Sequence, residues 1–320
     1  MDAMSTTDER TLLDRLRHCD VAERQLAIIA LEDVASLDSV EGLIHAVRDS
    51  DPTVRRLAVG LLEELGDGRA VPALLAAVED EVAEVRDAAE TALREVRDAA
   101  AIDSLVRAVG HPNAKVKRAA IVAVRELKDE RAIGPVIGAL TDPDGAVRRE
   151  AVITLGHFQR REGLAPLRGR LVDPDPDVRR LALGALAFFR DANLADAFIP
   201  LLEDADWRVR AEAAIVLGRV RATEAAAGLI AALDDSFWQV RKEAAVALGL
   251  LRTSLAELPL TKLLTSDVAD LRKVAATSLG ALGSRPAVPL LRALVDDPDA
   301  EVKKAAVRAL GLIEPADVRA

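Results

Sequence analysis

The chain has 320 residues, half of them hydrophobic, with 43 Lys and Arg against 53 Asp and Glu, which gives a net charge of −10. This acidic balance argues against bulk electrostatic binding to nucleic acid or to an anionic membrane, and the one cysteine, Cys19, excludes an internal disulfide framework or a multi-cysteine metal site. The first residues lack the apolar run of a secretory signal, and no uncharged apolar stretch is long enough to span a bilayer, so we expect a soluble, cytoplasmic protein without membrane contact.

A period of 31 residues runs through the chain. The clearest mark of each repeat is a cationic residue, here called the anchor: Arg24, Arg55, Arg86, Lys117, Arg148, Arg179, Arg210, Arg241, Arg272 and Lys303. Three residues after each anchor stands an alanine: Ala27, Ala58, Ala89, Ala120, Ala151, Ala182, Ala213, Ala244, Ala275 and Ala306. Because one such repeat is too short to bury its own apolar face, the period predicts an array of repeats that stack on their neighbours.

Each repeat is predicted to contain two helices. Apolar residues one before, three after and seven after the anchor lie on one stripe of a helix, and the preceding segment has a stripe of its own, as in Leu12, Leu13 and Leu16. The position six before the anchor, here called the turn position, is expected to end one helix and cap the next. It holds Asp49, Asp80, Asp142, Asp173, Asp204, Asp235 and Asp297, with His18 and His111 expected to do the same work in their repeats.

Ten repeats, beginning near residues 7, 38, 69, 100, 131, 162, 193, 224, 255 and 286, account for a single predicted array over residues 7–316, with tails at 1–6 and 317–320. The stretches "DPDGAVRREAVITLG", "DADWRVRAEAAIVLG" and "DPDAEVKKAAVRALG" resemble the HEAT-like repeats of the phycobilisome-lyase type. The resemblance implies an all-α, right-handed α-solenoid. It also implies that the second helices line a concave face and that recurring Asp and Arg residues link neighbouring turns.

The concave face is predicted to present the positions one, five and eight residues after the anchor. The first of these forms a basic row that includes Arg149, Arg180, Lys242 and Lys273, and the second is small or apolar. The third changes from charged residues in the first four repeats to small ones such as Gly218, Gly249 and Gly280. We therefore expect a groove that becomes smoother toward the C-terminus.

All seven aromatic residues lie between residues 158 and 238. Trp207 and Trp238 hold the same position at the start of the second helix, beside Phe237, and Phe188 and His157 lie near the other end of theirs. Exposed aromatic residues beside arginine often contribute most of the binding energy in protein interfaces. Phe158, Phe189 and Phe198 are instead expected to fill gaps in the alanine-rich core.

Three catalytic or ligand-binding alternatives follow from resemblance to other HEAT proteins. The resemblance to deoxyhypusine hydroxylase implies His-Glu pairs that bind iron. The matching pairs in this chain contain no histidine: Arg149-Glu150, Ala211-Glu212 and Lys242-Glu243. A resemblance to HEAT-like DNA glycosylases implies contacts with nucleic acid, but the negative net charge of the chain argues against such binding. A bilin-lyase-like or chaperone-like factor for a cofactor-containing protein stays open, although no bilin site is recognisable.

The sequence favours a non-catalytic scaffold that binds a helix or extended segment of a partner protein in the concave groove of the fifth to eighth repeats. No catalytic, metal-binding or cofactor-binding residue is predicted, and whether the protein has an enzymatic activity is left open. The expected partner-binding residues are Trp207, Trp238, Phe237, Phe188, His157, Arg149, Arg180, Lys242 and Lys273.

Overall fold

The computed structural model describes residues 8–189 and 194–314, and the secondary structure of these residues is entirely helical. The chain divides into two compact units, residues 1–163 and residues 164–320. The single array over residues 7–316 stays a prediction, and its two tails, residues 1–6 and 317–320, lie outside the described residues.

The N-terminal unit contains five pairs of a short and a long α-helix within its described residues. They are α1 (Glu9–Arg15), α2 (Val21–Leu31), α3 (Val40–Ala46), α4 (Pro52–Leu65), α5 (Val71–Ala77), α6 (Ala83–Glu95), α7 (Ile102–Ala108), α8 (Ala114–Leu127), α9 (Ile133–Ala139) and α10 (Gly145–Phe158). One-turn 3-10 helices lead into the later short helices: η1 (Leu37–Ser39), η2 (Gly68–Ala70), η3 (Ala99–Ala101) and η4 (Glu130–Ala132), while η5 (Arg161–Gly163) ends the unit.

The C-terminal unit repeats this pattern in its described part. Its α-helices are α11 (Leu164–Arg168), α12 (Pro176–Leu186), α13 (Ala195–Phe198), α14 (Trp207–Arg219), α15 (Ala226–Ala231), α16 (Trp238–Leu251), α17 (Glu257–Leu263), α18 (Ala269–Leu282), α19 (Val288–Ala293) and α20 (Ala300–Ile313). The 3-10 helices are η6 (Gly169–Val172), η7 (Ala187–Phe189), η9 (Ile199–Glu203), η10 (Thr223–Ala225), η11 (Ala232–Asp234), η12 (Ser254–Ala256), η13 (Arg285–Ala287) and η14 (Leu294–Asp296).

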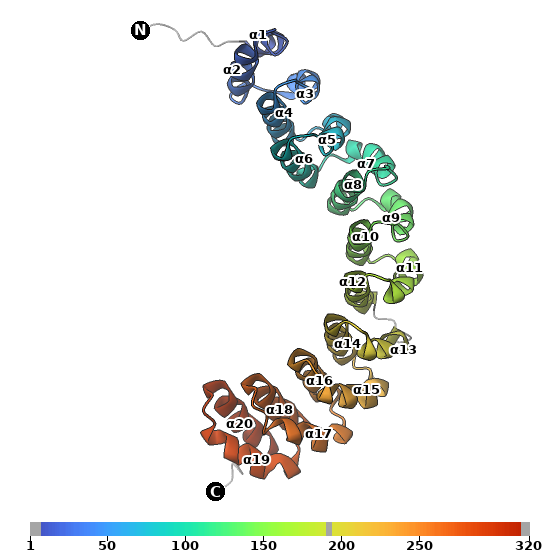
Figure 1. The fold of residues 1–320 in the computed structure, drawn as a ribbon, viewed down its shortest axis with the longest axis vertical. Coiled ribbons are helices and arrows are strands. Elements are labelled where there is room, and N and C mark those ends of the chain that lie inside the picture. Colours follow the sequence, from blue (N-terminus) through green and yellow to red (C-terminus); the bar gives the residue numbers. More distant parts are fainter. Residues whose placement is uncertain (1–7, 190–193, 315–320) are drawn as a thin grey trace. The chain divides into compact units, whose positions relative to one another are not determined.

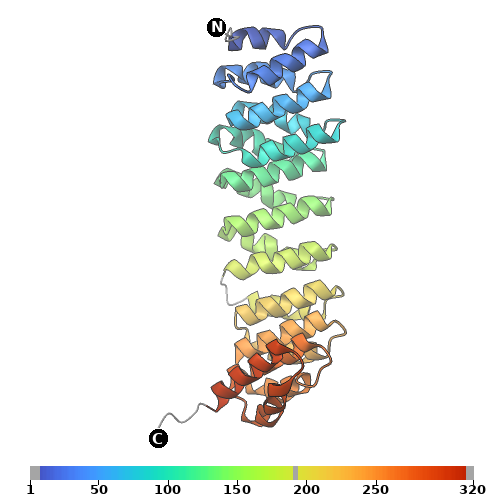
Figure 2. The same cartoon turned by 90° about the vertical axis from the view of Figure 1, so that its left-hand side faces the viewer.

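Within each unit, the long helices form one layer and the short helices the other (Figure 1). Successive long helices lie side by side (Figure 2). This two-layer stack of helix pairs is an α-solenoid, as the period predicted. Among the described helices, none combines the length and the apolar character needed to cross a bilayer.

The alanine that follows each anchor by three residues lies at the centre of the packing. All ten have 0% of their surface exposed: Ala27, Ala58, Ala89, Ala120, Ala151, Ala182, Ala213, Ala244, Ala275 and Ala306. A methyl group is the largest side chain that lets helices approach this closely without forcing their backbones apart. The invariance of this position along the chain therefore has a steric cause.

The anchor cations link consecutive repeats through ion pairs, which together we call the ladder. Arg55, for example, donates from Nε and Nη2 to the two carboxylate oxygens of Asp80, at 2.7 and 2.8 Å. Its Nη1 donates to the backbone carbonyls of Asp49 and Ser50, so one guanidinium joins two consecutive turns. The ladder pairs are Arg24–Asp49, Arg55–Asp80, Lys117–Asp142, Arg179–Asp204, Arg210–Asp235 and Arg272–Asp297.

The turn-position aspartates have a different task from the one predicted. Asp80 accepts the backbone N–H of Val82 at 2.9 Å and thereby shapes the turn, but the long helices are capped two residues later. Asp51, Asp144, Asp175, Asp206 and Asp299 are caps of this second kind, and each accepts a backbone N–H of the first helical turn. The aspartate at the turn position thus forms an ion pair with the anchor of the neighbouring repeat, and the residue at the cap position accepts hydrogen bonds from its own helix.

The smoother groove predicted at the eighth position after the anchor is wrong for the C-terminal unit. Gly218, Gly249 and Gly280 are buried, because the next long helix packs directly on them. A Cβ atom at Gly218 would lie 2.7 Å from Cα of Ala247, and one at Gly280 would lie 2.8 Å from Cα of Ala309. The glycines thus allow α14, α16, α18 and α20 to approach closely, and they are not available to a partner.

We predict that Gly280→Ala destabilises the protein by about 1 to 3 kcal/mol, because the new methyl group would overlap Ala309. The matched control is Gly311→Ala, at the same position of the last repeat, where an added Cβ would meet nothing within 4 Å. That change should be neutral or stabilise the helix by up to about 1 kcal/mol, since alanine favours helix over glycine. Urea unfolding followed by circular dichroism measures both, and equal effects of the two changes would contradict the packing described.

A second prediction concerns the ladder and pH. The hydrogen bond from Arg272 lowers the pKa of the buried Asp297 below its ordinary value of 3.8. Ionised Asp297 therefore stabilises the fold fully above pH 3.8, and this contribution is lost as the pH falls through the lowered pKa. At neutral pH, Asp297→Asn should cost about 2 to 4 kcal/mol, because a largely buried arginine loses its charged partner.

The measurement is the unfolding midpoint of wild type and Asp297→Asn across the acidic range. The difference between them should shrink as the pH falls below 3.8. Glu301→Gln is the control, since Glu301 and Lys304 form an exposed pair and the change should leave the midpoint nearly unaltered. A difference that stayed constant down to strongly acidic pH would show that the ion pair is not the stabilising element.

Candidate functional site

The nine predicted partner-binding residues fall on both units. Arg149 and His157 belong to α10 of the N-terminal unit, where Arg149 is half-buried and His157 is exposed in the last turn. His157 lines a shallow cavity of about 380 Å³ together with Phe158 and Glu130. The other seven residues belong to the C-terminal unit, and the candidate site is built from these seven.

The centre of this site is a stack of two aromatic rings from consecutive repeats. Trp207 begins α14 and Phe237 directly precedes α16, and their ring centroids lie 5.5 Å apart at an interplanar angle of 12°. The guanidinium carbon of Arg210 lies 5.7 Å from the centroid of Phe237. We call Trp207, Arg210 and Phe237 the aromatic step.

The ladder holds the aromatic step in place. Arg210 donates to both carboxylate oxygens of Asp235, at 2.6 and 3.0 Å, and Asp235 accepts the backbone N–H of Phe237 at 2.8 Å. Burial alone would raise the pKa of Asp235, but the hydrogen bonds from Arg210 and from this N–H outweigh it, so the pKa is lowered and Asp235 stays ionised. The phenyl ring is therefore fixed by the stack, by the cation and by its own backbone hydrogen bond.

Phe237 takes a position that other repeats use to cap their long helix. Asp206, its equivalent in the preceding repeat, accepts the N–H of Arg208 and has its pKa lowered to about 2, first by its hydrogen bonds from the Arg208 side chain. Phe237 has no such acceptor, and 43% of its surface is exposed. An acceptor at this position typically contributes about 1 kcal/mol, and α16 lacks this contribution, as do α6 and α18, which have Val82 and Val268 there.

The remaining aromatic residues divide between surface and core. Phe188, in η7 at the far end of α12, is 57% exposed, and Trp238, the first residue of α16, is half-buried. Phe198 is completely buried, which confirms that it fills the core, while Phe158 and Phe189 are half-buried. The exposed aromatic surface of the C-terminal unit thus consists mainly of Phe188 and the aromatic step.

The predicted basic row is less basic than its sequence suggests. Lys242 lies 3.4 Å from Glu243, Lys273 lies 3.3 Å from Asp270, and Arg180 lies 3.9 Å from Asp177. In the repeat between Arg180 and Lys242, the row position holds Ala211, which is buried. The cations on this face are therefore accompanied by carboxylates, and the row is interrupted.

Glu212 is a partly buried carboxylate of this face. Burial raises its pKa, the nearby Arg180 and Arg219 oppose the increase, and Glu243 adds to it. An oxygen of Glu212 lies 3.7 Å from where a Cβ of Gly184 would stand, so the side chain reaches across to α12. The long-helix layer therefore offers a partner both signs of charge.

The alternatives that require a metal gain no support here. Among the residues that the structure describes, no three His, Cys, Asp or Glu side chains gather closely enough to ligate an ion. The two carboxylates that match the hydroxylase pattern in the C-terminal unit, Glu212 and Glu243, are accompanied by Arg180 and Lys242.

The sequence matches the family of HEAT repeats over residues 9–94, 135–197, 195–271 and 257–320. The chain belongs to the HEAT-repeat family. Each pair of a short and a long helix described above is therefore one HEAT repeat. No curated protein matches the sequence.

Solved structures of similar fold span nearly the whole chain. An engineered protein is 23% identical, with a TM-score of 0.55, and the match covers 96% of this chain and 98% of that one. Kap95p, in a structure with RanGDP, is 16% identical with a TM-score of 0.64 over 97% of this chain and 50% of its own. YibA of Escherichia coli is 16% identical with a TM-score of 0.64 over 83% of this chain and 98% of its own. Sequence identities this low show that the folds are similar, and they carry no information on function.

We predict that Glu212→Gln stabilises the protein at neutral pH, because a neutral amide avoids the cost of burying the ionised carboxylate. A raised pKa means that Glu212 opposes folding when it is ionised, so the gain should vanish as the pH falls through the raised pKa toward the ordinary value of 4.5. Thermal unfolding measures the effect, with the exposed Glu224→Gln as control. A loss of stability at neutral pH would show that Arg180 and Arg219 outweigh the burial.

Proposed function

We propose that this HEAT-repeat protein is a non-catalytic scaffold that holds a helix or an extended segment of a partner protein. The binding surface is the long-helix layer of the C-terminal unit, along the edge where α14 and α16 begin. The proposal keeps Trp207, Phe237, Trp238, Phe188, Arg180, Lys242 and Lys273 as partner-binding residues. Arg149 and His157 are proposed as further contacts for the same partner.

The observation that carries this proposal is the aromatic step. A large apolar ring that is partly exposed, yet fixed by a stack and a cation, loses little conformational freedom when a partner covers it. Such rigid aromatic and arginine groups are the usual energetic centres of protein interfaces. Phe237 leaves 43% of its surface exposed at a position where most repeats have an acidic cap, which makes the ring available to a partner.

The charges of this face favour a partner that carries both acidic and basic residues around the apolar side chain it inserts. A purely acidic segment would meet Glu212 and Glu243, whereas a segment with acidic and basic flanks could pair with the cations and the carboxylates in turn.

The fold comparison is consistent with a scaffold. Kap95p, whose HEAT fold this chain shares, binds RanGDP in its structure, and by analogy we propose a protein as the ligand here. A cytoplasmic location and kinship with the phycobilisome-lyase type belong to the same proposal. The alternative of a bilin-lyase-like or chaperone-like factor would make the bound protein a cofactor carrier.

The test is affinity capture from the native cell extract with wild type and with the double variant Phe237→Ala, Trp238→Ala, followed by mass spectrometry. We expect wild type to capture a specific protein. The amount captured should fall at least about tenfold with the variant, since each of the two aromatic side chains contributes more than about 1 kcal/mol to binding. The matched control is Leu258→Ala on the short helix α17, which removes a 74% exposed leucine and should leave the capture unchanged.

Circular dichroism must show the same helix content for all three proteins. Equal capture by wild type and the double variant would contradict the proposal, and so would a loss that follows unfolding. If the captured protein carries a pigment or another cofactor, the cofactor-handling alternative replaces a general scaffold.

A further inference from the structure

Three arginines on consecutive repeats lie where the long helices of the C-terminal unit end. Arg221, Arg252 and Arg285 follow the ends of α14, α16 and α18, and all three are exposed. Among the residues of the described ranges, none provides a carboxylate that forms a salt bridge with any of the three. We call these residues the arginine edge, and their charges are available to a ligand.

The N-terminal unit neutralises a cation at the same position. Arg97 corresponds to Arg252, eleven residues after the anchor, and its Nη2 lies 3.3 Å from a carboxylate oxygen of Glu95, two residues earlier. In the eighth repeat the place of Glu95 is taken by Leu250, and in the seventh by Arg219. The arginine edge is therefore unpaired because its repeats lack the local carboxylate.

Exposed leucines lie on both sides of Arg252 in the sequence. Leu250, in the last turn of α16, is 48% exposed, and Leu255, in η12, is 70% exposed. The edge thus combines positive charge with apolar contact area. Other repeats have exposed charged residues at the position of Leu255: Arg69, Arg131, Glu162 and Glu224.

The packing of the long helices sets the spacing along this edge. A Cβ atom at Gly218 would lie 2.7 Å from Cα of Ala247, so α14 and α16 are in direct contact close to their ends. Helices packed in this way lie about 8 to 10 Å apart. Arg221 and Arg252 also share a left-handed backbone, with φ of 56° and 52°, so their side chains leave the two helix ends in similar directions. A chain in the polyproline II conformation repeats every three residues, or about 9 Å, which matches this spacing.

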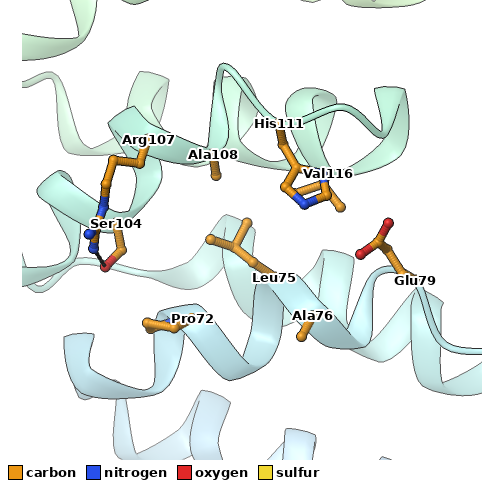
Figure 3. Close-up of a pocket in the computed structure, with 9 residues that line it drawn as sticks. All are labelled: Pro72, Leu75, Ala76, Glu79, Ser104, Arg107, Ala108, His111 and Val116. Carbon is orange, nitrogen blue, oxygen red and sulfur yellow. Dashed lines mark hydrogen bonds between the residues drawn. The ribbon is translucent and has the colours of Figure 1, made fainter.

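A cavity of the N-terminal unit shows an arginine that is engaged locally. It has a volume of about 310 Å³ and lies between the short helices α5 and α7 (Figure 3). At one end, Arg107 donates to the carbonyl of Asp103 at 3.2 Å and lies 3.4 Å from the hydroxyl of Ser104. The carboxylate of Glu79 lies at the other end (Figure 3), so an anion in this cavity would be attracted at one end and repelled at the other.

We propose that the arginine edge binds an extended acidic segment of a partner protein. Carboxylates three residues apart in this segment pair with Arg221 and Arg252, since a guanidinium can bind a carboxylate through two parallel hydrogen bonds. Arg285 adds a positive charge one repeat further along, and apolar side chains of the segment contact the two exposed leucines. These leucines favour a polypeptide over a nucleic-acid strand, and the net charge of −10 opposes a long polyanion.

This surface does not depend on the proposed scaffold surface. The aromatic step lies where α14 and α16 begin, and the arginine edge lies where they end. At 1.5 Å per residue, the two are about 20 Å apart along these helices. Each can therefore be removed by substitution without touching the other.

The test is isothermal titration calorimetry on the full chain with the capped peptide acetyl-Glu-Leu-Pro-Glu-Leu-Pro-Glu-amide, which places a carboxylate at every third residue. We expect binding that weakens as salt is added, because the paired charges are exposed. The same peptide with Gln in place of Glu should bind at least about tenfold more weakly. The peptide acetyl-Glu-Glu-Glu-Leu-Pro-Leu-Pro-amide, which has the same composition but adjacent carboxylates, should also bind more weakly.

Variants of the full chain locate the binding surface. Arg221→Gly with Arg252→Gly should weaken peptide binding at least about tenfold, because two charge-assisted pairs are lost. It should keep the unfolding midpoint, since relief of the left-handed backbone offsets the loss of a favourable charge at each helix end. The matched control is Lys128→Gly, at the same position of the N-terminal unit with φ of 54°, which should leave peptide binding unchanged. Leu250→Glu restores a local carboxylate and should weaken binding.

The double variant Phe237→Ala, Trp238→Ala should bind the peptide as wild type does, so failure of the scaffold surface and failure of the arginine edge are distinguishable. The proposal is overturned if the acidic peptide does not bind wild type, if the glutamine peptide binds equally well, or if the two arginine substitutions leave binding unaltered. A short oligothymidylate that binds more tightly than the peptide, with the same dependence on both arginines, would identify a nucleic-acid surface and would also overturn it.

Discussion

The bidentate ion pair between an anchor arginine and the turn aspartate of the next repeat is the interaction on which this architecture depends. One guanidinium, as in Arg55, holds the two carbonyls of its own turn and the carboxylate of the following turn, so each pair fixes the relative position of two helix pairs. Hydrophobic burial alone has no direction, and the alanine-rich layers could slide past one another. The ladder provides the direction, and its low exposure, 8% and 10% for the side chains of Arg55 and Asp80, limits screening by salt.

Much of the fold was predictable because the sequence repeats its constraints. The ten alanines and their stripe of apolar neighbours predicted two helices per repeat and a buried contact, and all ten are fully buried. The glycines were misread because a helical wheel describes one helix by itself. Gly218 lies on the side away from the partner short helix, as predicted, yet this is the side on which Ala247 of the next long helix packs. Only the spacing between consecutive long helices decides whether such a position faces solvent, and no single repeat contains that information.

The candidate site was predictable in its residues but not in its arrangement. The concentration of aromatic residues near Trp207 and Phe237 is visible in the sequence, whereas their stack joins residues 30 apart and depends on the spacing of two turns. A signal was present: Phe237 follows the turn aspartate by two residues, where most repeats have an acidic cap. The pairing of Lys242 and Lys273 with neighbouring carboxylates could likewise have been expected from Glu243 and Asp270 in the sequence.

Two steps of the ladder lack their carboxylate, because the turn positions that would pair with Arg86 and Arg241 hold His111 and Ser266. These interrupted steps bear on how the protein opens. In a stacked array, each repeat touches only its neighbours, so the stability is a sum of local terms and unfolding is cooperative only across interfaces of similar strength. An interface without its ion pair separates before those that have one. The repeats on either side of such a step would then exchange their amide hydrogens as separate blocks. A chain built from nearly identical repeats thereby acquires internal boundaries, and their places are set by single residues, His111 and Ser266.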